Sequence, residues 1–83
     1  MNKEGFIYVY KVEDNIYKLR ASIYKPIRKT LILIYCEDFR NIKQILRGFL
    51  RRSMNRKYGI DYFEYENKNI LINEILKIIN NFN

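Results

Sequence analysis

Aromatic residues alternate with β-branched residues and lysine near the start of the chain, a pattern that predicts a β-strand with both faces partly covered. In residues 5–12, GFIYVYKV, every second side chain from Phe6 to Tyr10 is aromatic and would lie on one face of the strand. Residues 13–15, EDN, are short polar residues of the kind that form turns, and residues 16–22, IYKLRAS, return to strand-like positions. The pattern therefore predicts an antiparallel hairpin.

Two more segments have the composition of strands. Residues 30–36, TLILIYC, form a continuous apolar run, which is typical of a strand covered on both faces, so we expect this strand in the middle of the sheet. Residues 60–66, IDYFEYE, predict a fourth strand. Between the second and third strands, Pro26 disfavours a helical conformation at Lys25 and leaves room for at most one helical turn.

The period changes to three and four residues after Asp38, whose short acidic side chain suits a helix N-cap. This period predicts an amphipathic helix of about four turns. The apolar positions are Phe39, Ile42, Ile45, Leu46, Phe49 and Leu50.

A last helix follows the fourth strand. Asn69 can cap it, and residues 70–82, ILINEILKIINNF, are apolar most of the way round the helix. We therefore expect this helix to be largely buried, with both Ile75 and Leu76 packed against the sheet.

The predicted elements follow the order β-β-β-α-β-α. A pair of helices packed on a small, mostly antiparallel sheet is the simplest way to bury their apolar faces, and it gives an α+β fold. Because the chain has 83 residues, no linker-like stretch and no repeat, we expect residues 1–83 to form a single domain.

Composition argues against several kinds of site. The chain has no histidine and one cysteine, Cys36, so it lacks the commonest general base, an internal disulfide and the usual Cys/His metal spacings. Cys36 ends a predicted core strand, where a buried thiol is the ordinary role. Glu37 and Asp38 precede a helix, where capping explains them better than a metal site does. We expect neither a metal nor another cofactor.

Hydropathy and codon usage bear on the setting of the protein. No apolar run approaches the about 20 residues of a membrane span, and the N-terminus lacks the apolar segment of a signal peptide. We therefore expect no membrane partner and an intracellular location, in the cytoplasm or nucleus of a host cell or packaged in a virion. Asn, Ile and Lys, whose codons are rich in A and T, supply 33 of 83 residues and indicate an AT-rich genome.

The net charge is concentrated in one segment. Residues 39–57 carry seven basic residues and no acid, whereas the other 64 residues carry nine of each, so the whole net charge of +7 lies there. Spacings of three and four residues predict one exposed basic stripe along the helix, suited to a polyanion. The stripe consists of Arg40, Lys43, Arg47 and Arg51, and Arg52, Arg56 and Lys57 extend it.

The segments GFIYVYKV, YKLRAS and PIRK together resemble the GIY-YIG nuclease superfamily, and most of all its viral and phage-associated branch, whose second motif often has the sequence K-I-G. In that family, Gly-x-x-Tyr and Tyr/Lys-x-Gly flank the active site, an arginine follows eight residues after the second glycine, and a later helix supplies a metal-binding glutamate. The positions that match are Tyr8, Lys18 and Arg28. Residues 59–66, GIDYFEYE, resemble the closing G-E-W-F strand, with Asp61, Tyr62 and Phe63 in those places.

The departures from the family pattern concern its chemistry. Arg20 stands where the family has glycine, and Lys43 stands where it has the metal-binding glutamate. No carboxylate occurs anywhere in residues 39–57, and the family's helix between the second and third strands is reduced to a turn. Because metal-assisted cleavage needs the metal to neutralise charge at the phosphate, the resemblance implies a nuclease-like site at Tyr8, Lys18 and Arg28 that has lost its activity.

The first hypothesis is therefore a catalytically inactive, GIY-YIG-like module of viral or other AT-rich-genome origin. It would bind the nucleic-acid backbone, DNA or RNA, without sequence specificity, because no base-reading motif is visible. The expected binding residues are Arg20, Arg28, Lys29, Arg40, Lys43, Arg47, Arg51, Arg52, Arg56 and Lys57.

Two alternatives stay open. A viral interaction or inhibitor protein, or a virion component, would instead dock its basic face on an acidic surface of a nucleic-acid-handling protein. Within this first alternative, the chain could equally form a small homodimer. A residual metal-dependent nuclease would need an unrecognised carboxylate, such as Glu64 or Glu66.

Overall fold

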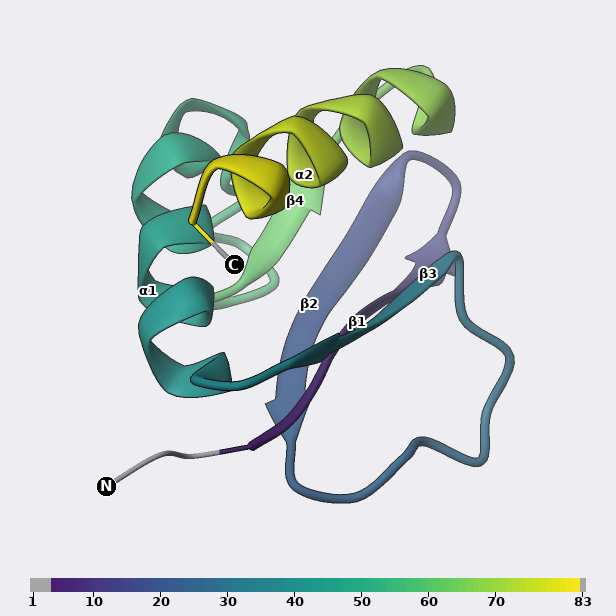
Figure 1. Ribbon diagram of the computed structural model, residues 1–83. Helices are drawn as coiled ribbons and strands as arrows, with labels where there is room; N and C mark the ends of the chain where they lie inside the picture. The colour runs from purple at the N-terminus through teal and green to yellow at the C-terminus, as the bar shows by residue number, and fades with distance from the viewer. Residues whose placement is uncertain (1–3, 83) are drawn as a thin grey trace.

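The computed structural model describes residues 4–82, which form a four-stranded antiparallel sheet and two α-helices (Figure 1). The strands are β1 (Gly5–Glu13), β2 (Ile16–Ser22), β3 (Ile32–Cys36) and β4 (Tyr62–Glu64), the helices are α1 (Phe39–Phe49) and α2 (Lys68–Phe82), and a short 3₁₀ helix, η1 (Arg51–Ser53), follows α1. The predicted α+β fold, with its small antiparallel sheet and two helices, is confirmed.

The hairpin of β1 and β2 forms as its alternation predicted. The two strands pair antiparallel, with Tyr8 opposite Arg20 and Val9 opposite Leu19. The turn between them places Asn15 at φ 68°, the left-handed region that asparagine tolerates better than most residues. These two strands form the middle of the sheet, in the order β3-β1-β2-β4.

The expectation that the apolar run at residues 30–36 forms a middle strand is wrong. The strand β3 pairs only with β1 and lies at an edge of the sheet. Its inward positions, such as Ile32 and Cys36, are buried, whereas Leu33 and Tyr35 on the other face are exposed. The outer side of β3 also carries apolar residues, and one of them packs against β1: the rings of Tyr35 and Phe6 meet edge to face, with their centroids 5.9 Å apart.

Both helices cover one face of the sheet, which we call the inner face; the opposite side is the outer face. Side chains from α1, α2 and the strands share a single apolar cluster there, and α1 also packs on α2. Its members include Ile7, Val9 and Leu19 from the sheet, Ile42 and Leu46 from α1, and Leu71, Ile75 and Ile79 from α2. Figure 1 shows the loop of residues 23–31, which contains no helix, extending from the sheet away from both helices.

Gly5 allows α1 to approach the sheet closely. A Cβ at this position would lie 2.6 Å from the carbonyl oxygen of Ser22 and 2.8 Å from Cδ1 of Phe39, the first residue of α1. The need for glycine here is therefore one of packing.

The helix α1 begins as predicted and ends earlier. Asp38 is its N-cap, since a carboxylate oxygen of Asp38 accepts a hydrogen bond from the backbone N–H of Asn41 at 3.3 Å. The helix has 11 residues, about three turns at 3.6 residues per turn instead of the expected four. Gly48 weakens its last turn, and the chain passes into η1 at Arg51.

The helix α2 is less buried than its composition indicated. Ile75 is fully buried, as predicted, but Leu76 is 39% exposed, so that part of the prediction is wrong. A helix presents one stripe to a neighbouring layer, and here the stripe is Leu71, Ile75 and Ile79. The helix also starts earlier than expected at Lys68, after Asn67 accepts the backbone N–H of Asn69.

A side-chain hydrogen bond connects the residue after β4 to α2. The Tyr65 hydroxyl donates to a carboxylate oxygen of Glu74 at 2.6 Å and so ties the end of β4 to α2; burial, and then this bond, raise the pKa of Tyr65 to about 12. Cys36 is a free thiol in the core, and burial raises its pKa. None of the helices in residues 4–82 has the length and hydropathy to cross a bilayer.

Candidate nucleic-acid interface

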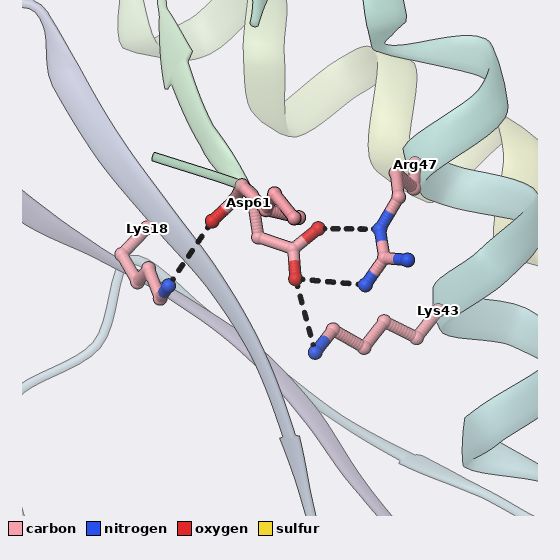
Figure 2. A network of polar contacts seen from close by, with 5 residues as sticks. Lys18, Lys43, Arg47 and Asp61 are labelled. Carbon is pink, nitrogen blue, oxygen red and sulfur yellow. Dashed lines mark hydrogen bonds and ion pairs between the residues drawn. The ribbon is translucent and has the colours of Figure 1, made fainter. Parts of the chain in front are cut away.

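A buried carboxylate organises the junction between α1 and β4. Asp61 is only 4% exposed and accepts two hydrogen bonds from the Arg47 guanidinium, from Nε to Oδ1 at 2.7 Å and from Nη2 to Oδ2 at 3.0 Å. The Lys43 ammonium lies 3.1 Å from Oδ2. Figure 2 shows both cations reaching the carboxylate from α1, whereas Lys18 on β2 donates a hydrogen bond to the backbone carbonyl oxygen of Ile60 at 3.2 Å and does not contact the carboxylate.

The electrostatics of this cluster favour its charged form. Burial alone would raise the pKa of the Asp61 carboxyl, but the hydrogen bonds and charges of Arg47 and Lys43 outweigh burial and hold the pKa below its ordinary value. The hydrogen bond to Asp61 in turn raises the pKa of Arg47. Asp61 is therefore ionised at neutral pH, and its oxygens are held by cations of the same chain.

The backbone around Asp61 explains why β4 is shorter than predicted. Asp61 has φ 69° and Gly59 has φ 124°, so the chain turns twice before it can pair with β2. Regular pairing starts at Tyr62, opposite Lys18. The same turn directs the Asp61 side chain towards α1.

The predicted exposed stripe needs a correction at two of its four positions. Arg40 and Arg51 are exposed, but the side chains of Lys43 and Arg47 retain only 26% and 40% of their exposure and pair with Asp61. The sequence analysis missed this pairing, because it considered only the acid-free segment and Asp61 lies outside it. The two paired cations contribute less free charge than the stripe implied.

The remaining cations of this segment form what we call the basic ridge. Each of them is exposed, and none forms an ion pair within residues 4–82. The basic ridge consists of Arg40, Arg51, Arg52, Arg56 and Lys57. Two of its members, Arg51 and Arg56, line an open hollow of about 460 Å³ together with Arg47.

The outer face of the sheet gathers the four positions that matched, or replaced, the strand and loop motifs of the family. Tyr8 stands opposite Arg20, and Lys18 opposite Tyr10. The Arg28 guanidinium lies over the Tyr10 ring, 4.0 Å from its centroid. The structure thus brings Tyr8, Lys18, Arg20 and Arg28 to one face but places Lys43 apart from them, with Asp61. Lys29, also expected at the interface, lies exposed in the loop beyond Arg28.

The carboxylates considered for a residual nuclease lie elsewhere. Glu64 accepts a hydrogen bond from Asn55 Nδ2 at 2.9 Å and pairs opposite Ile16. Ile16 is four residues from Arg20 along β2, or about 13 Å at the usual rise per residue. Glu66 is exposed beyond the end of β4. Within residues 4–82, no three His, Cys, Asp or Glu side chains gather in a way that could hold a metal ion.

Asp61 is the residue whose role sequence reasoning missed. A signal was present, because Asp61 shares the strand alternation of Phe63 and Tyr65, whose side chains face the helices. A carboxylate on a buried face needs cationic partners. Lys43 and Arg47, four residues apart on a helix, are such a pair.

No family model, curated protein or solved structure matches this chain. The resemblance to the GIY-YIG superfamily therefore rests on the motif residues alone.

Proposed function

We propose that this protein binds the sugar–phosphate backbone of nucleic acids through the basic ridge, without reading sequence. The observation that carries the proposal is the hollow lined by Arg51 and Arg56, two exposed arginines without an ion pair in residues 4–82, in a segment that contains no acid. Guanidinium groups bind phosphate oxygens in pairs of parallel hydrogen bonds, and two unpaired ones beside one hollow suit a polyanion.

The arrangement of charges supports backbone binding over a structural role for the ridge. Asp61 already accounts for Lys43 and Arg47, so the fold does not need the five ridge cations for its internal pairing. Like charges crowded on one surface repel each other unless an anion is present. Phosphate contacts alone carry no sequence information.

We propose further that the module is a GIY-YIG-like relative without nuclease activity. Support comes from Arg20 and Lys43, which stand where the family has a glycine and a metal-binding glutamate. Incubation with supercoiled plasmid and with single strands, in Mg²⁺ and in Mn²⁺, should leave the substrates intact. Nicking that disappears on Tyr8→Phe or Arg28→Ala would contradict this proposal.

The cellular setting belongs to the same proposal. Composition supports an intracellular protein of a virus or another AT-rich genome, acting in the cytoplasm or nucleus or carried in a virion. Detection of the protein in purified particles or in cell fractions would decide among these locations.

Salt dependence of duplex binding tests the ridge directly. If the ridge neutralises four to six phosphates, the slope of log affinity against log salt for duplex DNA should be about −4 to −5. The double reversal Arg51→Glu/Arg56→Glu should weaken all duplex sequences alike and flatten the slope by about two units. The matched control is Lys68→Glu/Lys77→Glu, which changes net charge equally at exposed positions of α2 and should have a much smaller effect.

One observation favours a protein partner as the second candidate function. Phe49 and Phe82 are both exposed, and their ring centroids lie 6.2 Å apart at the junction of α1 and α2. Exposed aromatic pairs beside a basic surface suit docking on an acidic protein, or between two copies of this chain. Absence of any mobility shift at low salt, with DNA and with RNA, would favour this candidate over nucleic acid.

A further inference from the structure

The outer face of the sheet belongs to a second acid-free segment. Residues 15–36 contain five basic residues and no acid, a feature hidden by the balanced charge of the chain outside residues 39–57. This segment supplies β2, the loop of residues 23–31 and β3. Its cations therefore reach the face that neither helix covers.

Aromatic rings and cations alternate across this face. Tyr8 and Tyr10 stack with centroids 6.3 Å apart and an interplanar angle of 26°. Arg28 lies over Tyr10, and the Lys18 ammonium lies 4.1 Å from the centroid of the Tyr62 ring. Aromatic rings hold these cations without neutralising them, so their charge stays available to an anion.

The loop of residues 23–31 borders an open hollow of about 390 Å³, which Tyr8 of the outer face also lines. Three of its lining residues carry flat or rigid surfaces: Tyr24, Pro26 and Arg28. Tyr24 is 75% exposed, so its ring is accessible to a ligand from solvent. Lys25 adds a cation to the same lining.

We infer that the outer face binds single-stranded nucleic acid, with one unpaired base stacked in the hollow against Tyr24 and Arg28. Arg20 and Lys25 lie beside this position and bind the adjoining phosphates. Lys18 extends the phosphate track towards Tyr62. The site lies on another face from the basic ridge and takes a different form of nucleic acid.

The chemistry favours single strands over duplex for a simple reason. Ring and guanidinium faces are complementary to the faces of bases, which a duplex keeps stacked inside. The acids near this face lie on its β3 side: partial loss of hydration, and then Glu4 and Glu37, raise the pKa of the exposed Tyr35. We therefore expect the bound nucleic-acid strand to run along the β1–β2–β4 side of the outer face, where the cations are.

The test compares two nucleic acids and two surfaces. Fluorescence anisotropy at low salt would measure binding of a labelled 12-nucleotide single strand and of a labelled hairpin duplex to the full chain. Tyr24→Ala should weaken single-strand binding roughly 5- to 150-fold, the range expected for loss of one stacked base. Duplex binding should change less than about twofold, because phosphate contacts by the ridge are untouched.

Two matched variants complete the design. Arg28→Lys keeps the charge but removes the planar group, so it should weaken single strands and leave duplex binding intact. The ridge reversal Arg51→Glu/Arg56→Glu should do the opposite. Tyr24 is exposed, so its replacement should leave the thermal unfolding midpoint unchanged.

The outcomes separate this inference from the proposed function. Wild-type affinity for single strands in folded Tyr24→Ala would overturn the single-strand site, as would absence of any single-strand binding by the wild type at low salt. Absence of duplex binding by the wild type at low salt would refute the basic-ridge proposal, whatever the result with single strands. Single-strand binding that falls only with the ridge reversal would also overturn the inference.

Discussion

Two pairs of cations in this molecule have the same residue types and opposite kinds of partner. Lys43 and Arg47 on α1 meet the buried carboxylate of Asp61, whereas Lys18 and Arg28 on the outer face meet the rings of Tyr62 and Tyr10. A carboxylate cancels charge and, when buried, depends on its cations. A ring cancels none, so the cation remains attractive to phosphate. The first pair therefore serves mainly the fold, and the second pair is available for binding.

The largest expected effect on stability concerns the apolar core, against which the effects of the cations can be compared. Ile75→Ala should lower the free energy of unfolding by about 2–5 kcal/mol, because the side chain is fully buried among residues of the sheet and α1. Leu76→Ala, on the next position of α2, should cost less than about 1 kcal/mol, since Leu76 is partly exposed. Urea denaturation followed by circular dichroism would measure both. Equal losses would show that α2 packs differently from the structure described.

The next largest effect should separate the carboxylate-bound cation from the free ones. Arg47→Ala removes two hydrogen bonds to a buried carboxylate and should cost about 1–3 kcal/mol in unfolding free energy, less than for a fully buried pair because Arg47 is partly exposed. Arg52→Ala, without an ion pair in the described residues, should cost less than about 0.5 kcal/mol. A similar loss in both variants would break the distinction.

Replacing the ring-bound cation Arg28 should lower the unfolding free energy by an amount between the losses for Arg47→Ala and Arg52→Ala. Arg28→Gln removes a partly exposed cation–ring contact and should cost about 0.5–1 kcal/mol. A loss as large as that of Arg47→Ala would mean that Arg28 is as important to the fold as Arg47. The same chemical denaturation experiment supplies the comparison.

The smallest expected effect is the dependence of folding stability on acidic pH through Asp61. Since the pKa of Asp61 is lower in the folded protein than its ordinary value of 3.8, its pairing stabilises the fold above about pH 4 and loses this contribution as the pH falls through the folded value. Asp61→Asn keeps the size of the side chain and tolerates the positive φ of 69°, but it cannot titrate. The stability gap between wild type and Asp61→Asn should therefore narrow below pH 4. A constant gap would contradict a charged Asp61 in the folded state.

Local patterns predicted most of the fold. The alternation in residues 5–22, the turn chemistry at Asn15 and the N-cap at Asp38 each act within a few residues, so they are legible in the sequence. The edge position of β3 depends on which strands pair across the sheet, and a run of apolar residues does not specify it. The exposure of Leu76 depends on how α2 is rotated against α1.

The candidate interface was predictable only in part. The concentration of cations in residues 39–57 was visible in the sequence, but the pairing of Arg47 and Lys43 with Asp61 joins positions 14 and 18 residues apart. The contact of Arg28 with Tyr10 likewise spans 18 residues and depends on the path of an irregular loop. Long-range partners decide which cations stay free, and sequence spacing does not report them.

The buried thiol of Cys36 allows opening of the fold to be measured by chemical labelling. The chain has one cysteine, and its sulfur lies in the core at the end of the edge strand β3. A thiol-specific reagent can reach it only when the core around it opens, and burial raises its pKa and slows the reaction further. The labelling rate in native buffer therefore counts openings of the fold at one known atom, without denaturant or an added dye.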